Sequence, residues 1–574
     1  MTLKRLISVA AGKEPADLVL HNGRMVDIVS GEIHPMGIAV AEGRIAGLGE
    51  RYQGLEAVDL HGRYICPGFI DAHVHVESSL VRPREFARAA VRCGLTTIVS
   101  NPHEIANVMG IEGIRFMLHD ICNAPLDCMF TIPSCVPATS LATSGAQLRR
   151  KEIELLLRKP GMVGLGEVMD FPGVIAGVPR LLEELEVCRG LPLDGHCPGL
   201  SGMELDAYSV TGIATEHECT TVEEAREKLR KGMKIFIREG SVARNLKTLL
   251  PLVTPCNERW LCFCTDDRRI ADIREEGSID HLVRMAIAGG IPPMMALRMA
   301  TLNPAEHFRL HDRGLIAPGR VANLVVFQDL NEPRPEQTYY NGVPVTGSSI
   351  VESGEPVKLE SRYEAQARDT MHVDWSGVDF RIPAEGNLVR VIGAIQDQLV
   401  TESIVMEPLI ISGNAESDPG RDLLKIAVIE RHRASGKMAM GFVRGIGLKR
   451  GALASTVAHD HHNLMVIGVD DVSMMTAARA VALACGGLAV ADGNAVLALL
   501  PLPIAGLMSD QTAGTVLSQE AALAGAAKKL GSALDDPFMT MSFLGLEVIP
   551  SLKLTDLGLV EVHRQKIVPL FLKQ

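Results

Sequence analysis

Two histidines one residue apart, His73 and His75, end an apolar run in GFIDAHVHVESS (residues 68–79). On a β-strand alternate side chains share a face, so both imidazoles would point the same way. Two adjacent imidazoles on one face can bind a metal ion. In a chain of 574 residues with 18 histidines, roughly one such pair arises by chance. The pair therefore predicts a metal site only if further ligands lie elsewhere.

The elements that would position such ligands form a repeating pattern between residues 66 and 310. Short apolar segments alternate with amphipathic helical stretches such as REFARAAVRCG and RRKEIELLLRK. The eight apolar segments are GFIDAHVHV, TTIVSNPHE, CMFTIPSCV, MVGLGEVMD, LPLDGHCPG, GIATEHEC, MKIFIREGS and WLCFCTDD. This alternation is typical of parallel βα units. Eight units favour a (β/α)8 barrel, with a doubly wound sheet as the alternative.

Metal-ligand side chains follow most of these segments, at the end of the strand where a barrel forms its active site. They are His73, His75, His103, Glu104, Glu167, His196, His217 and Asp266. Burying so many ionisable groups without a cation would be costly, because each charge would lose its hydration. Their repetition around one predicted barrel mouth therefore indicates a metal centre, which the histidine pair alone does not.

The predicted ligands suit two divalent ions rather than one. The two histidines of the first strand and Asp266 would hold the first ion. His196 and His217 would hold the second, and Glu167 would bridge the two. Two such ions can share a hydroxide whose pKa is lowered towards neutrality, which predicts a hydrolytic site. The glutamates that flank His217 could change the affinity for the second ion.

The segments outside the barrel predict further domains. Hairpin signals at Asn22-Gly23 and Glu42-Gly43 indicate a small antiparallel sheet, which GLIAPGRVANLVVF and TYYNGVPV could rejoin after the barrel. A polar stretch from about 352 to 385 looks like a connector, and the remainder has strands and helices of its own. We expect an α/β chain with a small β-sandwich built from both flanks of a TIM barrel, and a C-terminal α+β domain. The predicted divisions are 1–65, 66–310, 311–375 and 376–574.

Composition excludes several classes of protein. A hydrophobic content of 47% and a charged content of 22% are typical of a globular protein with a large core. The net charge of −12 argues against binding to nucleic acid. The opening residues do not read as a signal peptide, so the 12 scattered cysteines are expected to be reduced thiols in the cytoplasm. The most apolar tract, residues 495–508, is too short to cross a membrane.

The metal-ligand motifs at the strand ends resemble those of the amidohydrolase superfamily. Within that superfamily, they resemble the two-metal bacterial adenine deaminases. The matching stretches are PGFIDAHVHVESS, NPHEIANVMG, SCVPA, GEVMDFPGV, LDGHCPGL, IREGSVARNL and CTDDR, followed by VAHDHHNLMVIG, PLPIAGLMS and IPSLKLTD. The resemblance implies a hydrolase of purine salvage that converts adenine to hypoxanthine and ammonia. It implies two divalent metals, with Mn²⁺ expected first and Fe²⁺ or Zn²⁺ as alternatives. A homodimer is expected.

The same resemblance suggests roles for individual residues. Many amidohydrolases bridge their metals with a carboxylated lysine on the fourth strand, where this chain offers Glu167. Asp266 would take the proton from the attacking hydroxide, and His103 or Glu104 would protonate or polarise the purine ring. The chain departs from the family at Asn101, where an aspartate is usual, and this could shift the pH profile through His103.

Substrate contacts are expected from Glu77, Ser241, Arg244 and Asn245, which follow the first and seventh strands. A further cluster, His459, Asp460 and His462, could be accessory to the site, as a metal ligand or as a cover over it. It could equally be a polar turn.

Three other functions compete with adenine deamination. A cyclic-amide hydrolase of the same superfamily would have a similar metal site but would release no ammonia. A deaminase of an N6-substituted or related purine would release a different amine. A non-catalytic scaffold would be expected to lose ligands, and this chain keeps them. The small zinc-deaminase fold fails as an alternative, because its PCxxC motif does not occur.

Overall fold

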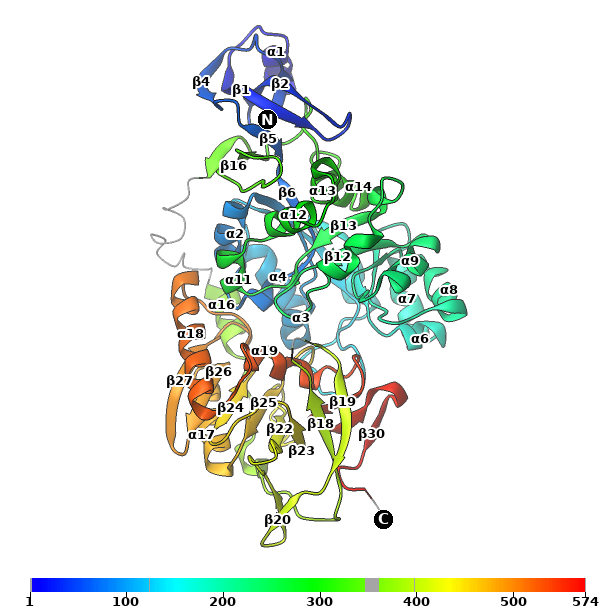
Figure 1. The fold of residues 1–574 in the computed structure, drawn as a ribbon, viewed down its shortest axis with the longest axis vertical. Helices are drawn as coiled ribbons and strands as arrows, with labels where there is room; N and C mark the ends of the chain where they lie inside the picture. Colours follow the sequence, from blue (N-terminus) through cyan, green and yellow to red (C-terminus); the bar gives the residue numbers. More distant parts are fainter. Residues whose placement is uncertain (1–2, 123, 346–360, 397, 573–574) are drawn as a thin grey trace.

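The computed structural model describes residues 3–122, 124–345, 361–396 and 398–572 (Figure 1). Three parts follow one another along the long axis of the molecule. A small β-domain lies at one end, a barrel in the middle and a C-terminal domain at the other end. The barrel and the C-terminal domain pack directly against each other.

All eight predicted strands are present, and they form the barrel in sequence order. They are β6 (Phe69–His75), β7 (Leu95–Ser100), β8 (Asp127–Pro133), β9 (Met162–Val168), β10 (Leu193–Gly195), β11 (Thr215–Glu216), β12 (Lys234–Arg238) and β13 (Leu261–Cys264). Neighbouring strands pair in parallel from β6 to β10 and from β11 to β13. The short β14 (Asp266–Asp267) follows β13 and pairs in parallel with β6, which brings the last strand back to the first. The prediction of a (β/α)8-type barrel is confirmed.

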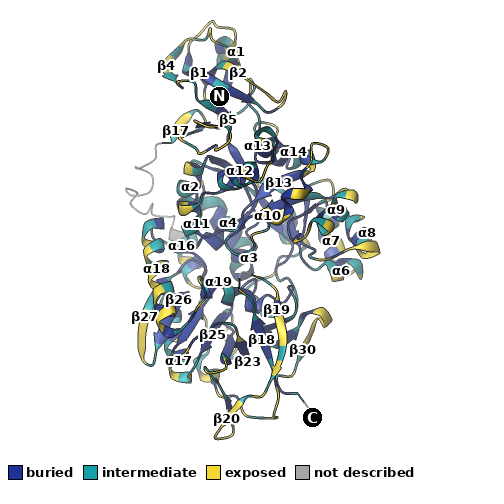
Figure 2. Ribbon diagram, in the orientation of Figure 1, coloured by how far each residue is buried: buried dark blue, intermediate teal, exposed yellow. Residues whose placement is uncertain are grey.

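Helices enclose these strands, so the strands are buried on both faces (Figure 2). The longer helices are α2 (Pro83–Ala90), α3 (His103–Met109), α4 (Ile111–Asp120), α5 (Arg150–Leu156), α7 (Pro179–Val187), α8 (Gly202–Ser209), α9 (Val222–Arg230), α12 (Ile279–Ala288) and α13 (Pro293–Met299), with α11 (Ile270–Glu275) and α14 (Leu302–His307) shorter. Every residue of β6 is buried, although three of them, Asp71, His73 and His75, are ionisable. Asp71 accepts hydrogen bonds from the backbone and hydroxyl of Thr265, which ties β6 to the closing strands.

The small β-domain is built from both flanks of the barrel, as predicted. One sheet contains β1 (Ala16–Asp27), β2 (Glu32–Ala41), β3 (Arg44–Leu48), β4 (Gly54–Asp59), β5 (Tyr64–Pro67), β15 (Leu324–Phe327), β16 (Gln337–Tyr340) and β17 (Val343–Val345). The strand β15 returns from beyond the barrel to pair antiparallel with β5. The first part of the predicted connector, residues 352–360, lies outside the described residues.

The C-terminal domain is α+β, as expected. Its main sheet contains β18 (Val389–Ala394), β19 (Thr401–Met406), β22 (Leu424–Ile429), β23 (Met438–Arg444), β24 (Ala452–Ser455), β25 (Leu464–Gly468), β26 (Gly487–Asp492) and β27 (Ala495–Pro501). The helices α17 (Asp471–Leu483) and α18 (Ala513–Leu530) pack on it, and α19 (Pro537–Ser542) lies towards the barrel. Residues 495–508 form β27 and the turn after it.

Two expectations from composition can be compared with the structure. The 12 cysteines all lie among the described residues and are free thiols. Among the helices of the described chain, not one combines the length and apolar character needed to cross a membrane.

Candidate active site

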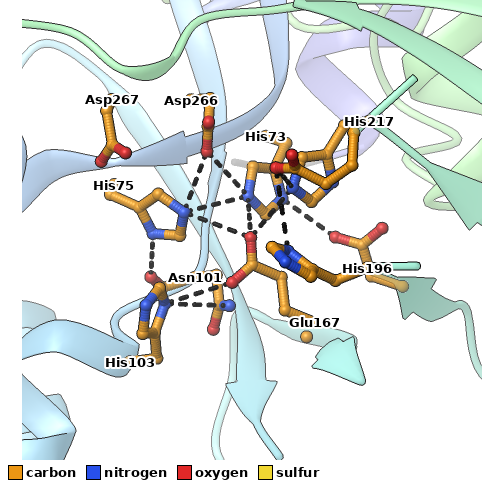
Figure 3. A network of polar contacts seen from close by, with 12 residues as sticks. His73, His75, Asn101, His103, Glu167, His196, His217, Asp266 and Asp267 are labelled. Atoms are coloured by element: carbon orange, nitrogen blue, oxygen red, sulfur yellow. Dashed lines mark hydrogen bonds and ion pairs between the residues drawn. The ribbon is translucent and has the colours of Figure 1, made fainter. Parts of the chain in front are cut away.

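Glu167, at the end of β9, lies at the centre of a buried polar cluster (Figure 3). Its Oε1 atom is 2.8 Å from His73 Nε2 and 3.3 Å from His75 Nε2. The same oxygen is 3.1 Å from Nε2 of His217, which follows β11. Ligand atoms of His73, Glu167, His217 and Asp266 all lie within 4.8 Å of one another. The barrel thus gathers at one point side chains that are far apart in the sequence.

The local sequence explains how Glu167 reaches this point. A Cβ atom on Gly166 would lie 2.7 Å from side-chain atoms of Asn101 and Thr131, so glycine is needed before the glutamate. Glu167 itself has a φ of 26°, where non-glycine residues are uncommon. Strain of this kind concentrates at functional sites, where the surrounding structure holds a residue in place.

The histidines of β6 are oriented by contacts behind them. His73 Nδ1 lies 2.9 Å from Oδ2 of Asp194, and His75 Nδ1 lies 2.9 Å from the carbonyl oxygen of Asn101. These contacts leave Nε2 of each ring towards Glu167, as is typical of metal-binding histidines. Burial would raise the pKa of the Glu167 carboxyl, but His75 and His73 hold it well below its usual range. Glu167 is therefore an anionic ligand-type side chain.

Asp266 reaches the cluster from the closing strand. Its Oδ1 atom is 3.1 Å from His75 Nε2, and its φ is 57°. Its Oδ2 atom accepts a 2.8 Å hydrogen bond from Nη1 of Arg238, at the end of β12. Burial acts to raise the pKa of Asp266, but the guanidinium of Arg238 and the β6 histidines hold it well below its usual range.

A second group of ligand-type atoms comes from His196, His217 and Glu218. Both histidines are buried, with 5% and 1% of their surface exposed. Within the described residues, neither ring nitrogen of His196 has a hydrogen-bond partner, and Nδ1 of His217 also has none, whereas its Nε2 faces Glu167. Buried polar atoms are usually satisfied, so these free nitrogens fit ligands of a cation.

His103 and Glu104, at the start of α3, connect the barrel to the C-terminal domain. His103 Nδ1 lies 3.4 Å from Oε2 of Glu167 and 3.3 Å from Nδ2 of Asn101. The contact through which Asn101 could influence His103 is therefore present. On its other side, His103 Nε2 is 3.3 Å from Oδ1 of Asp460.

Glu104 contacts the C-terminal domain through both carboxylate oxygens. Its Oε1 pairs with His459 Nδ1, and its Oε2 pairs with His462 Nε2. The His459 ring stacks on Phe543, with centroids 4.7 Å apart and planes 7° apart. The cluster suspected of an accessory role therefore lies against the predicted catalytic pair, and it comes from a different domain.

A cavity of about 30 Å³ lies over these groups. Its barrel side includes His75, His103, Glu104, Glu167, Met169, His196, Glu218, Arg238, Asp266 and Asp267, and its C-terminal side includes Leu399, His459, Asp460, Phe543, Leu546 and Ile549. The floor is charged, and much of the roof is apolar. A flat, neutral ring above a polar reacting centre would suit this arrangement.

A second cavity, of about 1040 Å³, adjoins the first and shares Glu218, Arg238, Leu399 and Ile549 with it. This outer cavity contains Ser241, Arg244 and Asn245, three of the residues predicted to bind substrate. Arg244 is directed to Glu276 at 3.1 Å, and Ser241 donates to Asp272. These three residues do not line the small cavity.

Glu77 also lies apart from the small cavity. It is buried, and its Oε1 accepts a hydrogen bond from the backbone N–H of Ile105 in α3. Burial raises the pKa of Glu77 to about 7. The hydrogen bond from Ile105 therefore links Glu77 to the helix that carries His103 and Glu104.

Sequence reasoning missed Arg238 and Asp194. Arg238 pairs with both Glu218 and Asp266, and Asp194 orients His73. Each lies at the end of a predicted strand, so the rule that located the other residues could have identified them.

Comparison with known proteins adds to this geometry. Residues 64–347 match the amidohydrolase family, and residues 398–566 match the adenine deaminase C-terminal domain. The chain is 48% identical over 569 residues to an adenine deaminase of Desulfatibacillum aliphaticivorans, covering 99% of each chain. It is 46% identical to adenine deaminase 2 of Carboxydothermus hydrogenoformans, covering 99% of this chain and 100% of that one. An adenine deaminase of Cereibacter sphaeroides is also 46% identical, with the same coverage.

Proposed function

The chain belongs to the adenine deaminase family of the amidohydrolases, and from this premise we propose that it hydrolyses adenine to hypoxanthine and ammonia. The observation that carries the proposal is the buried cluster around Glu167, which gathers ligand atoms from several barrel strands. Full-length similarity to adenine deaminases favours this reaction over ring opening of a cyclic amide.

The donor set fits two divalent cations. We assign His73, His75 and Asp266 to one cation. We assign His196, which follows β10, and His217, which follows β11, to the other cation. Glu167 is shared, since its Oε1 faces the first group and His217 alike. Mixed imidazole and carboxylate donors suit Mn²⁺, Fe²⁺ and Zn²⁺. Of these three cations, we propose that the protein binds Mn²⁺. When bound, such cations lower the pKa of water to near neutrality, which supplies the nucleophile for hydrolysis of a C–N bond.

The protein's own side chains then handle protons. Asp266 accepts a proton from water through Oδ1, while Arg238 fixes its other oxygen. The pair His103 and Glu104 delivers a proton to the purine ring nitrogen beside the attacked carbon. The amino group leaves as ammonia with the proton that Asp266 releases. The proton that remains on the attacking oxygen returns to the pair His103 and Glu104 as the carbonyl group of hypoxanthine forms.

The outer cavity provides the route by which the purine base arrives. Ser241, Arg244 and Asn245 line this route and act on the encounter rather than on the chemical step. The enzyme is proposed to act in the cytoplasm, consistent with its free thiols, and to form a homodimer.

Product analysis tests the reaction. Purified protein supplied with Mn²⁺ under reducing conditions should convert adenine to hypoxanthine and release one ammonia per hypoxanthine. An N6-methyladenine control should react much more slowly. Preferred release of methylamine, or turnover of cyclic amides without ammonia, would replace the proposed substrate.

A further inference from the structure

The C-terminal domain places two buried polar atoms at the small cavity without a protein partner. They are Nε2 of His459 and Oδ2 of Asp460, whose residues are 3% and 4% exposed. Across the described part of the chain, neither atom has a hydrogen-bond partner. The cost of leaving a buried polar atom unpaired is substantial, so both atoms point to a ligand that satisfies them.

Both side chains are held rigidly from behind. His459 Nδ1 pairs with Glu104, and its ring stacks on Phe543. Asp460 Oδ1 lies 3.3 Å from His103 Nε2. Each residue therefore has one polar atom fixed by the protein and a second one left free, which is the arrangement expected of a preorganised recognition site.

The free atoms are complementary to the edge of a purine base. Although burial lowers the pKa of His459, Glu104 and Asp267 raise it to about 9, so Nε2 carries a hydrogen near neutral pH. Nε2 is then a donor, and Oδ2 of Asp460 is an acceptor. A purine offers ring nitrogens that accept and N–H groups that donate. Phe543, Leu546 and Ile549 supply the apolar surface that a flat base needs.

We propose that His459 and Asp460 recognise the purine base, so that the C-terminal domain supplies substrate specificity to a barrel that supplies the chemistry. The inference rests on the proposed function. The cavity of about 30 Å³ has room for water but is too small for a bicyclic base. The base would therefore extend from His459 and Asp460 into the adjoining outer cavity of about 1040 Å³, which shares Leu399 and Ile549 with the small one.

The test compares His459→Gln and Asp460→Asn with two matched variants, His461→Gln and Asp556→Asn. His461 and Asp556 are also buried in the C-terminal domain and also carry an unpaired polar atom, but neither is among the described residues that line the cavity. KM and kcat for adenine are measured, with the Kd for hypoxanthine and the metal content of each protein.

The two recognition variants should raise KM and the hypoxanthine Kd by about 10- to 100-fold, as expected for loss of a buried hydrogen bond to ligand. Their metal content should be unchanged, and the matched variants should bind like wild type. Unchanged KM and Kd in both recognition variants, with normal wild-type turnover, would overturn this inference alone. Absence of adenine turnover in wild type would overturn the proposed function and this inference with it.

One other result would contradict the recognition role of Asp460. His103, Cys135 and Asp460 have ligand-type atoms within 4.8 Å of one another. A third equivalent of bound metal in wild type that is lost in Asp460→Asn would assign the free oxygen of Asp460 to a cation instead of the base.

Discussion

The barrel half and the C-terminal half of the active site line the same cavity with different chemistry. On the barrel side, anionic and imidazole groups crowd around Glu167 at ligand distances. On the C-terminal side, the described lining residues include the apolar Phe543, Leu546 and Ile549 beside two polar residues, His459 and Asp460. In the proposed account, the barrel half holds cations and moves protons, whereas the C-terminal half covers and orients a flat base. If the two halves have different roles, substitutions in them should change different measured properties.

The largest effect is expected from Glu167→Gln. A neutral amide cannot serve as an anionic ligand shared by two groups, so bound metal should fall and turnover should drop by about 10⁴-fold or more. Metal content and kcat are measured together. The matched variant Glu184→Gln alters another buried barrel glutamate, whose pKa burial raises to about 7, and should stay active. Full activity and normal metal content in Glu167→Gln would contradict the bridging role.

Asp266→Asn should have the next largest effect. The variant should fold, because the amide can keep one contact with Arg238, but it loses the proton acceptor. We expect kcat to fall by about 10²- to 10⁴-fold, the range typical of a general base. Circular dichroism and thermal unfolding check that the fold is intact. Turnover at the wild-type rate would show that Asp266 is not the group that accepts the proton.

The contact between the two halves predicts a pH-dependent stability. Glu547 of the C-terminal domain accepts a hydrogen bond from the hydroxyl of Thr139 in the barrel, and burial raises its pKa to about 7. The folded state then binds this proton more tightly than the unfolded state, whose carboxyl titrates near the ordinary value of about 4.5. The stabilising contribution is complete below that value and is lost as the pH rises through 7.

Glu547→Gln removes this titration. Relative to the variant, the free energy of unfolding of wild type should fall between pH 5 and pH 8, by at most about 3 kcal/mol. Denaturant unfolding of both proteins at several pH values measures the difference. Parallel pH curves would show that Glu547 does not titrate in this window.

The smallest effects are expected in the outer cavity. Arg244 is partly exposed and ion-paired with Glu276, away from the metal cluster. Arg244→Ala should change kcat/KM by no more than about threefold, mainly through KM, since exposed ion pairs contribute little. A large fall in kcat would place this residue in the chemical step and would require the site to extend beyond the small cavity.

The sequence predicted the barrel, and it predicted which strand ends lie close together, for a physical reason. Strand periodicity locates each strand end, and parallel strands bring those ends together, so Glu167 and His217 could be expected to meet. Strand periodicity does not predict where Arg244 and Asn245 lie, because the loop after β12 extends into the outer cavity. There Arg244 forms an ion pair with Glu276 at the end of α11. The docking of His459 onto Glu104 depends on a contact between residues 355 positions apart in the chain, for which the sequence has no periodic signal.

The central claim is that one buried cluster holds two divalent cations that the hydrolysis of adenine requires. The most direct measurement is a titration of metal-free protein with Mn²⁺, followed by adenine turnover and by bound metal. The account predicts that a chelator abolishes activity and that activity returns to a plateau at two equivalents of Mn²⁺ per chain. A plateau at one equivalent, or adenine turnover that survives complete metal removal, would contradict it.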